Sequence, residues 1–219
     1  MSSLAVKRTQ IIRPRARRLP PAERRAQLLA CALRVFARRG LGEARHAEIA
    51  QEAGVSLSSV FFYFPTRPAL VRAVLDEVDR FYLDMAKRTH ERDLLVPQTL
   101  LEHALTFTES VDTHSDYARV WLDWSTAIRD EVWPRYLDFQ ERLVQIIAQT
   151  ISRGQREGTL AADVDPEDTA LLLISAAHMV AQMKFTQRAP EKIESFLRTL
   201  MRAATGNLPS GSVPHLHPR

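Results

Sequence analysis

The residues that most clearly indicate a chemical role are the basic side chains near the N-terminus. Residues 1–72 contain 14 Lys or Arg against 4 Asp or Glu, whereas residues 73–219 contain 16 against 22. This asymmetry favours contact of the basic segment with a polyanion, because neutralising phosphates releases their bound counterions. A basic surface that only faces solvent is the alternative that charge alone leaves open.

Patterns for catalysis or metal binding are weak. His46-Ala47-Glu48 has the H-x-E spacing of the zinc deaminases, but the companion P-C-x-x-C is absent. Cys31 is the single cysteine, and its place in an apolar helical pattern indicates a buried side chain. The seven glycines form no phosphate-binding loop. We therefore expect no catalytic residue, no metal site and no cofactor.

A helix-turn-helix is the element that would position basic residues on DNA, and residues 46–64 have its pattern. Two short helices, 46–53 and 57–63, are predicted on either side of a turn at Gly54. The second helix of such a unit lies in the major groove of DNA. Four residues have the sizes that packing of the two helices requires, namely Ile49, Ala50, Val55 and Val60.

The rest of the chain has apolar residues at three- and four-residue spacing, which is typical of amphipathic helices. Gly40 ends the first helix, and Thr66 and Asp165 can cap later ones. Helices are predicted at 22–39, 66–88, 96–112, 116–129, 134–157, 165–186 and 190–204. No segment alternates as a strand would, so the fold class is all-α.

Residues 26–70 resemble the DNA-binding domain of the TetR family. VFARRGL ends the first helix, GVSLSS forms the turn, and FFYFPTR closes the second short helix. Within that family, RPRARRL and VWLDWSTAIRDEVWP are similar to the quorum-sensing master regulators of the LuxR/HapR/SmcR type. The resemblance implies an N-terminal three-helix helix-turn-helix domain and a C-terminal helical bundle that dimerises. It also implies a transcriptional regulator that binds a pseudo-palindromic operator in double-stranded DNA as a homodimer.

The resemblance assigns DNA contacts to individual residues. Base edges are read by Ser58, Ser59 and Phe62; phosphates are held by Ser56, Tyr63, Thr66 and Arg67; and an adjacent minor groove takes Arg13, Arg15 and Arg17. Phe62 stands where the quorum-sensing group has an asparagine. It can contact a thymine methyl group but cannot hydrogen-bond to a base. Packing of Phe62 on Tyr63 or on the DNA backbone is the alternative.

The resemblance also implies an apolar cavity for a small apolar effector in the bundle. Its expected lining is Tyr82, Met85, Trp121, Tyr136, Gln140, Val144, Ile147 and Ala177. Gln140 would orient the ligand through its amide. The helices at 165–186 and 190–204, the first rich in small residues, resemble the family's dimer-forming pair. An ordinary core helix within one subunit is the alternative for the first of them.

Four segments result from these observations. They are a basic flexible arm (1–19), a helix-turn-helix DNA-binding domain (20–66), a ligand-sensing and dimerisation domain (67–206) and a disordered tail (207–219). No apolar run is long enough for a membrane span, so we expect a cytoplasmic protein. A nucleoid-binding or partner-binding protein that senses nothing, and a local repressor of an efflux or catabolic operon, are the alternatives.

Overall fold

Every regular element in residues 19–205, the range that the computed structural model describes, is an α-helix, as the apolar spacing predicts. The predicted tail and, except for Leu19, the predicted arm with Arg13, Arg15 and Arg17 lie outside that range. The helices of the described range are α1 (Pro21–Arg39), α2 (His46–Ala53), α3 (Leu57–Tyr63), α4 (Arg67–His90), α5 (Val96–Thr113), α6 (Ser115–Ser125), α7 (Trp133–Arg156), α8 (Pro166–Phe185) and α9 (Pro190–Thr205).

Local signals set several of the helix ends, and these predictions are confirmed. Gly40 and Gly54 follow α1 and α2 with φ of +82° and +65°, a region that favours glycine. Thr66 caps α4 by accepting the backbone N–H of Ala69 at 3.2 Å. The Asp165 carboxylate accepts two N–H groups in the first turn of α8, each at 2.9 Å. Each cap satisfies donors or acceptors that the helix itself cannot pair.

One predicted helix is too long. The spacing predicts a helix over 116–129, whereas α6 ends at Ser125. The hydroxyl groups of Ser125 and Thr126 donate back to the Leu122 carbonyl, at 2.8 and 3.4 Å. The indole N–H of Trp124 donates to the Val132 carbonyl at 3.1 Å, which folds the following loop back onto the helix. These contacts compete with continued helical hydrogen bonding.

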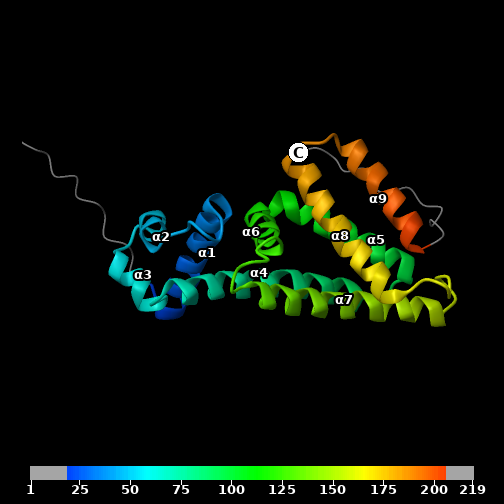
Figure 1. Ribbon diagram of the computed structural model, residues 1–219, viewed down its shortest axis with the longest axis horizontal. Coiled ribbons are helices and arrows are strands. Elements are labelled where there is room, and N and C mark those ends of the chain that lie inside the picture. The colour runs from blue at the N-terminus through cyan, green and yellow to red at the C-terminus, as the bar shows by residue number, and fades with distance from the viewer. Residues whose placement is uncertain (1–18, 206–219) are drawn as a thin grey trace, which may run out of the picture.

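Figure 1 shows how the helices are arranged. The first three form a separate group at one end, and α4 leads away from them along the long axis of the molecule. α7 lies beside α4, and α5, α6, α8 and α9 complete the bundle. Buried residues run along α4 from Leu70, in the core of the first group, to Met85, in the bundle. A tilt of α4 within the bundle would therefore move the first group.

Ion pairs hold α4 against α7. The Asp79 carboxylate is buried and accepts from the Arg142 guanidinium at 2.6 Å, while Arg135 pairs with Asp76 nearer the start of α4. A buried carboxylate needs such a partner because burial removes its hydration.

None of the helices in the described part of the chain combines the length and apolar composition that a membrane crossing requires.

α8 carries apolar residues on two faces. Ala170, Ala176 and Ala181 are buried within the subunit, where α8 packs against α7 and α5. Leu172 and Met179 are on the other face and are 44% and 47% exposed. The small residues thus serve packing inside the subunit, and the large exposed ones form an apolar stripe that nothing in residues 19–205 covers.

Candidate nucleic-acid interface and ligand cavity

The exposed surface of α3 contains all three predicted base-reading residues. Ser58 is exposed, Ser59 is half-buried, and Phe62 is 79% exposed. Val60 faces the opposite way and is fully buried. The same short helix therefore packs on the protein through one side and presents polar and aromatic groups on the other.

Packing on Tyr63, one of the alternatives considered for Phe62, describes part of its environment. Its ring meets the ring of Tyr63 edge to face, with 5.0 Å between the centroids. Nevertheless most of the Phe62 side chain faces solvent. Contact with Tyr63 restricts the ring without covering it, so the exposed face is free to meet an apolar group such as a thymine methyl.

Four predicted phosphate contacts lie around this helix. The Ser56 hydroxyl accepts the Ser59 N–H at 3.2 Å, which caps α3, and Thr66 caps α4. The Ser56 hydroxyl also shares a hydrogen bond of 2.9 Å with the Ser58 hydroxyl, in which either oxygen can donate. The Arg67 guanidinium donates to the carbonyl oxygens of Leu41 and Gly42, the latter at 2.7 Å, and so braces the loop after α1. Tyr63 is half-buried. A phosphate role for these residues stays a prediction.

His46 is a structural residue that the sequence reasoning did not identify. Its Nε2 donates to the Phe64 carbonyl at 2.9 Å, and its ring stacks on Phe61 at 4.4 Å with an interplanar angle of 14°. The start of α2 is thereby joined to the end of α3. The sequence feature that could have indicated this contact is a histidine at the start of one short helix and a run of aromatic residues at the end of the next. Only the tertiary structure brings the two together.

Part of the basic charge in the first group is already paired. Glu52 of α2 accepts from Arg34 at 2.6 Å and also bonds to Arg38, and Glu48 accepts from Arg39 at 2.7 Å. The bonds from Arg38 and then Arg34 lower the pKa of Glu52 below its ordinary value, despite partial desolvation. These arginines fix α2 on α1, so not all of the positive charge is available to DNA.

A hydrogen bond joins the bundle to the first group at the end of α1. The Asp123 carboxylate of α6 accepts the Leu41 N–H at 2.5 Å. A Cβ atom added to Gly40 would lie 3.2 Å from the same carboxylate, so glycine permits this close approach. α6 therefore contacts the first group directly, in addition to the route through α4.

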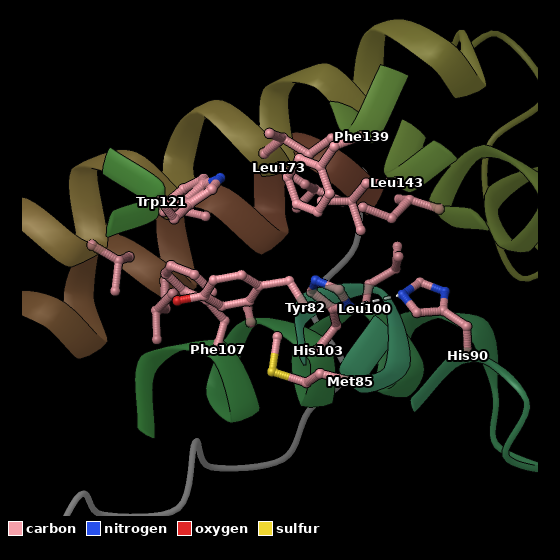
Figure 2. A pocket seen from close by; sticks show the side chains of 16 residues that line it. Tyr82, Met85, His90, Leu100, His103, Phe107, Trp121, Phe139, Leu143 and Leu173 are labelled. Atoms are coloured by element: carbon pink, nitrogen blue, oxygen red, sulfur yellow. Dashed lines mark hydrogen bonds between the residues drawn. The ribbon is translucent and has the colours of Figure 1, made fainter. Parts of the chain in front are cut away.

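The bundle contains a cavity of about 40 Å³ between α4, α5, α6, α7, α8 and α9, which Figure 2 shows from close by. Of the residues expected to line the cavity, Tyr82, Met85, Trp121, Ile147 and Ala177 do so. The complete lining adds His90, Leu100, His103, Ala104, Phe107, Phe139, Leu143, Leu173, Ile174, Val180 and Leu197.

Tyr136, Gln140 and Val144 are expected lining residues that the structure places elsewhere. The row on α7 that faces the cavity is Phe139, Leu143 and Ile147. Positions 136, 140 and 144 form the neighbouring row. Gln140 and Val144 each follow a cavity-facing residue by one position, and one residue turns the helix by about 100°. The Tyr136 ring instead packs between Trp124 and Trp133, with centroids 5.6 and 5.2 Å away. Gln140 therefore contributes no amide to the lining.

Comparison with known proteins places this chain in a family. Residues 28–74 match the family described as bacterial regulatory proteins, tetR family. The HTH-type transcriptional regulator LuxR of Vibrio harveyi is 34% identical over 191 residues, which is 87% of this chain and 91% of that protein. The chain belongs to the tetR family. The resemblance to the LuxR type expected from the sequence is confirmed by the same match.

Solved structures agree on the fold of this TetR-family regulator. A TetR-family transcriptional regulator from Agrobacterium tumefaciens superposes with a TM-score of 0.76 at 15% identity, covering 85% of this chain and all (100%) of the other. A TetR-like regulator from Rhodococcus sp. RHA1 gives 0.70 at 21% identity, with 85% and 96% covered. TetR-family regulators bind DNA operators and act as dimers. The protein is therefore a helix-turn-helix transcriptional regulator.

Two histidines at one end of the cavity make an electrically neutral pair. His90 Nδ1 lies 2.7 Å from the Thr150 hydroxyl, and His90 Nε2 lies 3.0 Å from His103 Nδ1. Burial, together with the nearby His103 and Arg153, lowers the pKa of His90 to about 3. Burial lowers the pKa of His103 to about 4. Both imidazoles are uncharged at neutral pH.

The pair predicts that acid destabilises this TetR-family regulator. Below the ordinary histidine pKa, about 6.5, the unfolded chain binds protons that folded His90 and His103 do not, so folding stability falls as pH drops toward about 4. The loss is at most about 1.4 kcal/mol per histidine for each pH unit. Urea unfolding at fixed protein concentration should show His90→Gln with a shallower dependence between pH 7 and 5. The exposed His114→Gln serves as the control, and equal slopes for all three proteins would contradict the prediction.

Proposed function

We propose that this regulator binds a pseudo-palindromic operator as a homodimer, and that a small apolar molecule in the cavity changes its affinity for that DNA. The observation that carries the proposal is the exposed face of α3, with Ser58, Ser59 and Phe62. It lies inside the segment that matches the tetR family. A regulator of this kind works where the chromosome is, so we place it in the cytoplasm and assign it no catalytic step.

The apolar stripe on α8 supports a homodimer. Leu171, Leu172 and Met179 are large, exposed and close together on one helix, beside α9. Pairing two such stripes about a two-fold axis removes them from water and makes the contact self-complementary. The same axis would set two copies of α3 about 34 Å apart, which is one turn of DNA.

Two structural connections support communication between the cavity and the first group, α1 to α3, which contains the helix-turn-helix. Tyr82 and Met85 line the cavity from α4, the helix whose start belongs to the first group. Trp121 lines it from α6, two residues before the Asp123 carboxylate that accepts the Leu41 N–H. A ligand that binds one arrangement of α4 and α6 better than another would shift the spacing of the two α3 helices.

Selection of duplexes from a random pool by the purified full-length protein tests the DNA-binding proposal. We expect enriched sites with two inverted half-sites one turn apart and an affinity that falls steeply as salt rises. Retention of all duplexes with equal affinity would favour a nucleoid-binding protein instead. Adding small apolar compounds to the selected complex then tests whether operator affinity responds to them.

Replacing Phe62 with asparagine is expected to change the selected half-site without affecting the fold. The side chain is mostly solvent-exposed, so the substitution removes little packing, whereas an amide can make two hydrogen bonds to adenine. One such pair discriminates between bases by about 1–3 kcal/mol. The same selection repeated with Phe62→Asn measures the change, with thermal unfolding as the control for folding. Recovery of the wild-type site would remove Phe62 from the base-reading set.

A further inference from the structure

Among residues 19–205, no charged side chain lines the cavity. The lining residues in the described range are aliphatic or aromatic apart from Tyr82, His90 and His103 and the thioether of Met85. A carboxylate or ammonium group entering this space would lose its hydration and find no opposite charge. Both histidines of the lining are neutral, and the guanidinium of Arg153, which is near enough to His90 to lower its pKa, lies outside the lining. The lining therefore disfavours charged molecules.

The Tyr82 hydroxyl is an unused hydrogen-bond donor. The Tyr82 side chain is 3% exposed, and its oxygen is buried without a hydrogen-bond partner. The Ser110 hydroxyl is near enough to lower the pKa of Tyr82 slightly, but its geometry does not make a hydrogen bond to the Tyr82 oxygen, and it donates instead to the Phe107 carbonyl at 2.7 Å. Burial raises the pKa of Tyr82, so the hydroxyl keeps its hydrogen. A buried donor without an acceptor is unfavourable, and an entering acceptor would relieve that cost.

The donor is separated from the histidine pair. Figure 2 shows the Tyr82 hydroxyl pointing away from His90 and His103. The phenol ring meets the rings of Phe107 and Trp121 at centroid distances of 5.8 and 5.7 Å. The acceptor that Tyr82 would meet must therefore be carried by a molecule whose remaining surface can pack against aromatic rings.

We propose that the cavity selects uncharged, largely apolar molecules that carry a hydrogen-bond acceptor, and that the Tyr82 hydroxyl donates to that acceptor. A carbonyl oxygen on a small aromatic or aliphatic molecule has this chemistry. The cavity is small, about 40 Å³, and Met85 in its lining is unbranched and adaptable, so the lining can adjust to the shape of such a molecule. This inference rests on the proposed function only in assuming that the cavity receives a ligand.

Three probes of similar size separate the contributions of charge and hydrogen bonding. Acetophenone has the carbonyl acceptor, α-methylstyrene replaces the carbonyl oxygen with a methylene group, and benzoate carries a negative charge. Titration into the full-length protein without DNA, followed by calorimetry and by the tryptophan fluorescence, to which Trp121 in the lining contributes, gives each dissociation constant. We expect acetophenone to bind about tenfold more tightly than α-methylstyrene. Benzoate should bind at least tenfold more weakly than acetophenone.

Tyr82→Phe removes the donor and keeps the ring. In this variant acetophenone and α-methylstyrene should bind with equal affinity. Tyr117→Phe is the matched control, because the Tyr117 hydroxyl bonds to Glu77 at 3.1 Å and is not part of the cavity lining. It should keep the tenfold preference. Removing an unpaired hydroxyl does not create a cavity, so Tyr82→Phe is expected to fold.

Several outcomes would overturn the inference. These are equal binding of acetophenone and α-methylstyrene to the wild-type protein, tight binding of benzoate, an unchanged preference in Tyr82→Phe, and no saturable binding of any probe. Operator affinity, measured in parallel, separates this inference from the proposed function. Absence of probe binding with intact operator binding rejects the cavity chemistry alone. Probe binding that leaves operator affinity unchanged supports the chemistry and rejects regulation through the cavity.

Discussion

Leu172→Glu is expected to produce a folded monomer whose operator affinity is at least about a hundredfold lower than that of the wild-type protein. Leu172 is 44% exposed on α8, in the stripe that we assign to the homodimer. A two-fold axis would bury the new carboxylate twice, without a partner. The subunit should fold, because the side chain already faces solvent. The loss of affinity follows because two linked half-sites bind far more tightly than one.

Sedimentation and titration of the selected operator measure these two effects. Leu137→Glu is the matched control, since Leu137 is 46% exposed but lies on α7. It should leave both the dimer and the operator affinity intact. A Leu172→Glu protein that sediments as a dimer would show that the α8 stripe is not the contact between subunits.

Trp124→Ala is expected to lower the free energy of unfolding by about 3–5 kcal/mol. Trp124 is fully buried (0% exposed), and its ring stacks on Phe139 with centroids 5.5 Å apart. Its indole N–H also holds the loop before α7 through the Val132 carbonyl. Truncation therefore leaves a large cavity between α6 and α7 and an unpaired carbonyl group.

Urea unfolding followed by circular dichroism, at one protein concentration, gives the loss for Trp124→Ala. Trp133→Ala is the comparison variant, because Trp133 is only half-buried although its ring also stacks on Tyr136. We expect its effect to be clearly smaller. Equal losses in the two variants would mean that burial between α6 and α7 is not what makes Trp124 important.

The DNA-binding group was largely predictable because its determinants are close together in the sequence. Gly54 and Val60 lie within one helical unit, and their small size and apolar character are visible without a structure. The bounds of α2 and α3 match the prediction. What the sequence did not predict there is the bond from His46 to the Phe64 carbonyl, which joins residues 18 positions apart.

The cavity was less predictable because its lining depends on the rotation of α7. Apolar residues occupy both the row that contains Leu143 and the row that contains Val144, and periodicity alone favours neither. Packing of α8 and α5 decides that Leu143 faces the cavity. The two histidines come from α4 and α5, so their contact has no local sequence signal either.

The sequence by itself determined where the helices lie, which helix end receives a capping side chain, and which segment carries the helix-turn-helix, because turns, caps and apolar spacing act over a few residues. The tertiary structure alone decided that the Tyr82 hydroxyl is left without a partner, that His90 and His103 meet, and that Asp123 reaches the end of α1. These features depend on how distant helices pack, and packing fixes which side chains lose water and which of them find a partner.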